Sequence, residues 1–256
     1  MKRNWLSYMY MAALLTGTLT SCDESSFLNL SDPNHFTESN FWKDKADAES
    51  ALAAAYSPIK GAMYGYFGAF DGWLNLNGRG DDIYTIKGEE VPMWNIANFL
   101  NSPSTGNDPY GALYSGIQRA NIVLRYIDQI PASGITEDDR SMIKGEALFL
   151  RGYQYFLLVN NYREVPLRLL PSNEDETNKG PASEAALWAQ VEDDLGNAIK
   201  CNLPVERTTA KERVTKGAAI AMLGKVYATQ HKYPEAKQLL GTLLTCLLYT
   251  SDAADE

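Results

Sequence analysis

A glycine-rich stretch from Gly61 to Gly106 holds the side chains whose types and spacing could do chemistry. Its pieces AFDGWLNLNGRGDDIY and EEVPMWNIAN place aromatic rings among carboxylates, amides and a guanidinium group. Aromatic rings can cover the apolar face of a small ligand, while planar amides and carboxylates can hydrogen-bond its polar groups. Our candidate ligand contacts are Trp73, Arg79, Asp81 and Trp94. The alternative is that the tryptophans hold this stretch on its scaffold and that Asp and Asn cap its turns.

Adjacent carboxylates are the other candidates for chemistry, because glycosidases use two carboxylates several ångströms apart. The pairs are Asp81-Asp82, Glu89-Glu90 and Asp193-Asp194. Neighbouring residues point in different directions, and we expect the third pair to lie on an exposed helix face. The sequence contains no nucleophile elbow, phosphate loop, HExxH motif or histidine-based triad. We therefore predict that the protein is not an enzyme.

Composition excludes further classes of site and partner. The formal net charge is −9, and the only basic run is Lys2-Arg3, so nucleic acid is not an expected partner. Two histidines and three scattered cysteines do not suit a zinc site or a disulfide framework. No metal or other cofactor is expected. With 45% hydrophobic residues, the chain has enough apolar material for a sizeable core.

The N-terminal segment has the parts of an export signal. Lys2 and Arg3 precede an uncharged apolar stretch that ends in LTSC at residues 19–22. This ending matches the bacterial lipobox, in which cleavage leaves a lipid-modified cysteine as the first residue. We therefore expect residues 1–21 to be removed and Cys22 to carry acyl chains that hold the protein on a membrane. The alternative is an ordinary signal peptide in which the cysteine has no special role.

The last eleven residues, CLLYTSDAADE, resemble the translation of a transposon-type sequencing adapter. We expect the authentic sequence to end near Thr245, so residues 246–256 carry no functional interpretation. The domain prediction is thus a signal peptide at 1–21, one helical region at 22–245 and an adapter-like end.

The elements that must position the candidate residues are mostly helical. Apolar periodicity predicts helices over 44–63, 109–131, 137–161 and 183–201, and two more from 214 onwards. We expect Pro58 to kink the first helix or end it early. No period is sustained between Gly61 and Gly106, which predicts a long irregular loop of the kind that is usually functional.

The final two helices have the spacing of a tetratricopeptide unit. Small residues at Gly224 and Ala236 would let two antiparallel helices approach closely, while Tyr227 and Leu240 fill the space between them. The two preceding helices could form a more degenerate unit. In that unit, one face (Leu150, Gly152, Tyr155, Leu158) would meet another (Leu187, Val191, Leu195). The alternative is any helical hairpin with a small-residue contact.

Four segments resemble the SusD/RagB family of nutrient-binding outer-membrane lipoproteins. They are CDESSFLNLSDP, FWKDKADAESALAAAY, GIQRANIVLRYID and EALFLRGYQYFLLVNNYREVPL. The resemblance covers residues 22–245 and implies an all-α fold, a scaffold of tetratricopeptide-like helical hairpins with long irregular loops. Arg163 stands where the family usually has glycine, so we expect the turn at YREVPL to be less tight.

The resemblance also implies a role. Family members lie at the cell surface, lipid-anchored in the outer membrane, and pass oligosaccharides or peptides to a SusC-like TonB-dependent transporter. The alternative is a lipid-anchored tetratricopeptide adaptor that binds a protein partner. Adaptors keep short turns between helices, so the long loop from Gly61 to Gly106 favours capture of a small ligand.

Overall fold

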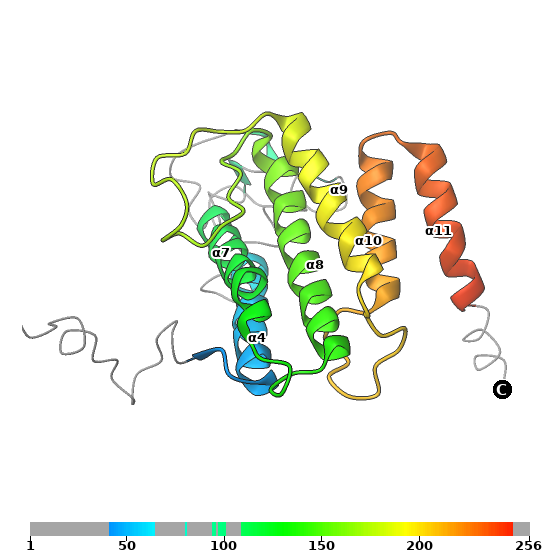
Figure 1. Cartoon of the computed structure of the whole chain (residues 1–256). Coiled ribbons are helices and arrows are strands. Elements are labelled where there is room, and N and C mark those ends of the chain that lie inside the picture. Colours follow the sequence, from blue (N-terminus) through cyan, green and yellow to red (C-terminus); the bar gives the residue numbers. More distant parts are fainter. Residues whose placement is uncertain (1–40, 65–79, 81–93, 96, 101–108, 248–256) are drawn as a thin grey trace, which may run out of the picture. The chain divides into compact units, whose positions relative to one another are not determined.

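The computed structural model describes residues 41–64, 80, 94–95, 97–100 and 109–247. Within these ranges the regular elements are all helical, which confirms the all-α prediction (Figure 1). They are α4 (Lys45–Tyr64), α7 (Tyr110–Tyr126), the 3-10 turn η1 (Ile127–Gln129), α8 (Glu137–Tyr162), α9 (Glu184–Lys200), α10 (Lys216–Thr229) and α11 (Tyr233–Leu247). All belong to one unit that begins at Trp42.

Hydroxyl side chains begin three of the helices. Thr136 accepts the Asp139 N–H at the start of α8, and Ser183 and Thr215 accept the equivalent N–H groups of α9 and α10. Each bond satisfies a backbone donor that the helix leaves unpaired. The boundaries predicted for 137–161 and 183–201 are therefore correct to within about a residue, because cap residues mark them.

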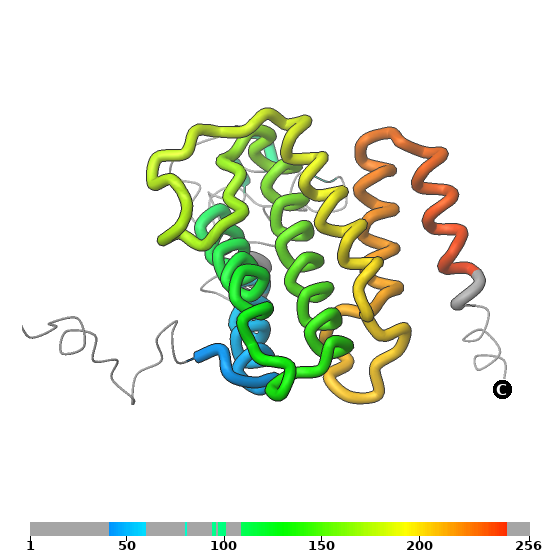
Figure 2. Tube along the Cα trace, viewed as in Figure 1, coloured from blue at the N-terminus to red at the C-terminus, as the bar shows by residue number. Residues whose placement is uncertain are grey.

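Consecutive helices pack side by side as hairpins, α7 with α8, α8 with α9, and α10 with α11 (Figure 2). The predicted faces of α8 and α9 meet in the main core, where Leu150, Tyr155, Leu158, Leu187, Val191 and Leu195 are all buried. Gly152 allows this approach, since a Cβ there would lie 3.1 Å from Leu195 Cγ. Gly224 plays the same part between α10 and α11, where a Cβ would lie 2.4 Å from Leu240 Cδ2. These contacts and the helix order confirm the tetratricopeptide-like scaffold.

α4 passes through Pro58 and continues to Tyr64, so the helix does not end early there. One local expectation is wrong. The turn after α8 is tight although Arg163 occupies it: this residue has φ 62°, and the Glu164 N–H donates to Tyr162 O at 2.8 Å. A three-residue turn of this kind is strained for a residue with a side chain. The chain therefore makes the turn without glycine and bears the cost in backbone strain.

Candidate functional site

Of the four predicted ligand contacts and the lipidation site, the structure describes only Trp94. Trp73, Arg79, Asp81 and the lipidation candidate Cys22 lie outside the described residues. Trp94 is half-buried in a short helical turn. Its carbonyl oxygen accepts the Asn98 backbone N–H at 3.1 Å and the Asn98 amide at 2.7 Å. These two hydrogen bonds from Asn98 hold the turn that carries the indole.

The same turn presents a second aromatic ring that the sequence interpretation did not select. Phe99 is 68% exposed and has φ 57°, and Leu100 beside it is 49% exposed. An L-residue at positive φ costs roughly 1 kcal/mol or more, and such strain is found mostly at functional positions. An aromatic residue in a loop of Asn, Trp and Gly was the available signal. Trp94, Asn95 and residues 97–100 thus form a turn with two exposed apolar side chains, which we call the Trp94 turn.

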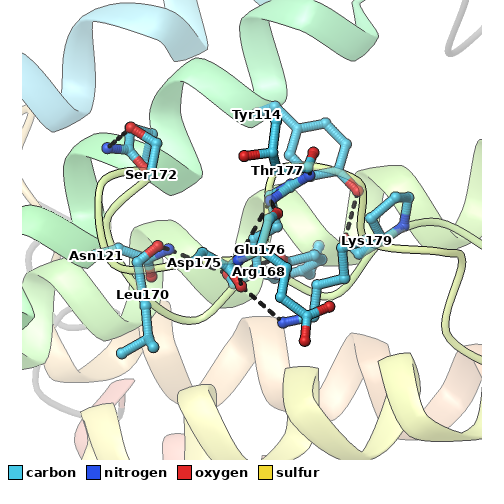
Figure 3. Close-up of polar contacts among 12 residues, drawn as sticks. Tyr114, Asn121, Arg168, Leu170, Ser172, Asp175, Glu176, Thr177 and Lys179 are labelled. Atoms are coloured by element: carbon cyan, nitrogen blue, oxygen red, sulfur yellow. Dashed lines mark hydrogen bonds and ion pairs between the residues drawn. The ribbon is translucent and has the colours of Figure 1, made fainter.

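The connection between α8 and α9, residues 163–183, is held on the scaffold by side chains of α7 and α8 (Figure 3). Asn121 donates from its amide nitrogen to both Arg168 O and Leu170 O at 3.1 Å. The Tyr155 hydroxyl donates to Arg168 O at 2.9 Å and accepts the Arg168 N–H at 2.6 Å. Four hydrogen bonds from two buried residues therefore determine the path of this connection.

Contacts along α7 extend this attachment in both directions. The Tyr114 hydroxyl donates to Pro166 O at 2.5 Å, within the motif YREVPL. Nearer the end of α7, Arg125 Nε donates to both carboxylate oxygens of Glu174, at 2.8 and 3.1 Å. The connection is thus attached along most of the length of α7.

Charged side chains within the connection are paired with one another (Figure 3). The Arg168 guanidinium donates to Glu176 O and Thr177 O and lies 3.4 Å from the Asp175 carboxylate. Lys179 Nζ is 3.1 Å from the same carboxylate. Burial raises the pKa of Asp175, but the hydrogen bonds from Lys179 and the Glu176 N–H outweigh it, so the pKa lies below its ordinary value. These groups are committed to the fold, which makes the connection a rigid support.

The carboxylate pair Asp193-Asp194 does not lie on an exposed face as expected, because only Asp193 is exposed. Asp194 is 0% exposed and accepts N–H groups from Arg151 at 2.6 and 2.8 Å and from Gln190 at 3.0 Å. Burial raises the pKa of Asp194, against the opposing effect of the Arg151 guanidinium. Both carboxylate oxygens are occupied, so this group serves the core. An arginine on the apolar face of α8 was the signal for a buried partner.

Glu146 is a second buried carboxylate with a structural role. Its oxygens accept from Arg207 at 2.6 Å, from Arg213 at 2.8 and 2.9 Å and from the Tyr56 hydroxyl at 2.5 Å. These partners come from α4 and from the connection between α9 and α10. The carboxylate therefore joins three parts of the scaffold and has no free lone pair directed at a substrate.

A metal centre and a membrane span are both absent from the part of the chain that the structure describes. No group of three or more His, Cys, Asp or Glu side chains there could hold a metal ion. None of the helices described combines the length and the apolar character needed to cross a bilayer.

Comparison with known proteins gives one consistent result. A family model for SusD-like proteins, described as starch-binding and associating with the outer membrane, matches residues 79–228. A SusD-like protein of Formosa agariphila is 25% identical over 246 residues, which cover 93% of this chain and 45% of that protein.

Solved structures agree with the family match. A laminarin-binding SusD-like protein has a TM-score of 0.68 and 30% identity, over 77% of this chain and 43% of that one. A SusD superfamily protein from Bacteroides vulgatus has a TM-score of 0.67 and 29% identity, over 80% of this chain and 44% of that one. The chain thus spans less than half the length of these relatives.

Proposed function

The chain belongs to the SusD-like family of starch-binding proteins that associate with the outer membrane, and from this premise we propose that it captures oligosaccharides at the cell surface. The observation that carries the proposal is the family match over residues 79–228, which include the Trp94 turn. A relative of similar fold is named for laminarin binding, which adds a β-linked glucan to starch as a ligand class.

The Trp94 turn supports the proposal physically. Its indole and the exposed Phe99 ring supply the apolar surfaces that sugar rings cover, and a turn held by two bonds from Asn98 has less freedom to lose on binding. We further propose that Trp73, Arg79 and Asp81 contribute to the same site. In this proposal the guanidinium and carboxylate bind hydroxyl groups and the second indole extends the aromatic surface.

The protein is proposed to bind its ligand without cleaving it. Asp194 and Glu146 are fully buried and bonded to arginines, so neither is available as a general acid or base. In the same proposal, acyl chains on Cys22 anchor the protein in the outer membrane, and a SusC-like TonB-dependent transporter receives the oligosaccharide. Peptides are the competing ligand class.

Calorimetric titration of the full chain with maltoheptaose and laminarihexaose tests the ligand class. We expect Trp94→Ala to weaken binding of the preferred glycan at least about fivefold, since stacking on one aromatic ring is worth roughly 1 kcal/mol or more. The helical circular-dichroism spectrum should not change. An affinity equal to that of the wild type would remove Trp94 from the site, and heat released only by peptides would contradict the glycan assignment.

Labelling of cells with a radioactive fatty acid tests the anchor. The wild-type chain should incorporate label and fractionate with the outer membrane, whereas Cys22→Ala should do neither. An unlabelled wild-type chain in the soluble fraction would contradict the anchor. Co-purification of a TonB-dependent transporter from the same membranes tests the delivery step.

A further inference from the structure

A groove lies between α9 and the turn that joins α10 to α11. It has a volume of about 450 Å³, within the ~300–1,000 Å³ typical of small-molecule sites. The residues that line it come from two segments about forty positions apart. They are Glu184, Ala185, Trp188, Ala189 and Glu192 of α9, with Gln230 and Lys232 of the turn.

The indole ring of Trp188 is held in position on one side of this groove. Its Nε1–H donates to the Glu184 carboxylate at 3.3 Å, and its ring meets Phe156 in an edge arrangement with centroids 6.0 Å apart. Ala185 and Ala189, one turn apart on α9, are short and exposed. They leave space beside the indole that longer side chains would fill.

The polar groups of the groove are arranged by bonds among themselves. The Glu192 carboxylate accepts from the Gln230 amide at 2.7 Å and pairs with the Lys232 ammonium. The turn that brings these two residues to α9 includes His231 at φ 61°, a conformation that L-residues rarely adopt. Backbone strain is thus accepted where the rim of the groove is built.

The paired charges around the groove favour a neutral ligand over a charged one. Each carboxylate has a cationic neighbour, Lys232 for Glu192 and Arg163 at 3.6 Å for Glu184. A charged ligand would have to compete with these pairs, whereas a neutral polar one would not. The paired groups still have unused hydrogen-bond capacity, since a carboxylate has about four acceptor sites and an ammonium three donors.

We propose that this groove, on elements separate from the Trp94 turn, is a second binding site for a neutral saccharide. The sugar ring would lie against Trp188, and its hydroxyl groups would bond to Glu192, Gln230 and Lys232. The ligand class rests on the proposed function, but the location does not. Two separate contacts with one glycan chain would raise its overall affinity through effective concentration.

The test uses the indole signal of Trp188, which reports on this groove and not on the Trp94 turn. The full chain, labelled with ¹⁵N-tryptophan, is titrated with maltoheptaose and with laminarihexaose, and total binding is measured by calorimetry in parallel. The Trp188 cross-peak is identified by its loss in Trp188→Phe. We expect it to shift saturably with at least one of the two glycans.

A matched pair of substitutions on α9 separates a local effect from a change in folding. Ala189 lines the groove and Ala186 does not, yet both are exposed on the same helix. Glutamine is a good helix former, so both substitutions preserve α9. Ala189→Gln should weaken the glycan affinity measured at the Trp188 cross-peak at least tenfold, and Ala186→Gln should leave that affinity unchanged.

Three outcomes would overturn the proposal. Calorimetric binding with an unmoved Trp188 signal would remove the groove and leave the proposed function standing. A shift caused by a peptide such as trialanine, and by neither glycan, would refute the saccharide class. Absence of both heat and shift with the two glycans would contradict the groove and the proposed function together.

Discussion

The substitution Asp194→Asn tests the buried ion pair that joins α8 to α9. The asparagine keeps the shape of the side chain but removes the counter-ion of Arg151, a residue only 8% exposed. Breaking one side of a buried pair costs ~3–5 kcal/mol, a large part of a total stability of ~5–15 kcal/mol. With a urea dependence of ~2 kcal/mol per molar, the unfolding midpoint should fall by about 2 M.

The adjacent residue provides the control. Asp193 is exposed and accepts one hydrogen bond from Asn197 at 3.0 Å, so Asp193→Asn should change the free energy of unfolding by less than ~0.5 kcal/mol. Replacing both partners, Arg151→Met with Asp194→Leu, should recover much of the loss because no unpaired charge remains. Unfolding in urea is monitored by helical circular dichroism. Equal midpoints for Asp194→Asn and Asp193→Asn would refute a stabilising role for the buried ion pair.

Two further predictions concern single sites. Arg163→Gly should stabilise the fold by about 1 kcal/mol, because glycine relieves the backbone strain of φ 62°. The exposed ion pair with Glu184, which this substitution removes, contributes little to stability. A lower thermal midpoint would contradict this prediction. Lys45 donates to Asp139 at 2.8 Å and is the main cause that lowers the pKa of that carboxyl. The pair therefore adds stability above the ordinary pKa of aspartate, and this is lost as the pH falls through the lowered pKa. Lys45→Met should raise the Asp139 pKa towards its ordinary value in a carboxyl ¹³C titration, and an unchanged pKa would exclude the ion pair.

The helical scaffold follows closely from local sequence. Cap residues such as Thr136 and Ser183 mark where helices begin, and a repeat of apolar residues every three or four positions identifies their buried faces. The small residues Gly152 and Gly224 indicated where helices approach closely, and both have a large side chain of the next helix against them. These signals extend over only a few residues, so they can be recognised in the sequence without a structure.

Polar contacts and surface grooves that depend on distant residues were not predicted. Arg151 and Asp194 are 43 positions apart, and nothing near Asp194 in the sequence marks it as buried. The groove beside Trp188 likewise arises only when α9 meets the turn after α10. Of the predicted ligand contacts, Trp94 lies on a described turn. Phe99, which is exposed and has a positive φ, was missed because neither property follows from the local pattern of residues.

Oligosaccharide capture without cleavage is the central claim, and one dialysis experiment tests both the binding and the absence of cleavage. The full chain is mixed with maltoheptaose or laminarihexaose, bound and free glycan are separated by equilibrium dialysis, and the recovered glycan is analysed for chain length. We expect saturable retention of at least one glycan at its original length. Failure to retain either glycan, or recovery of shortened products, would contradict the account.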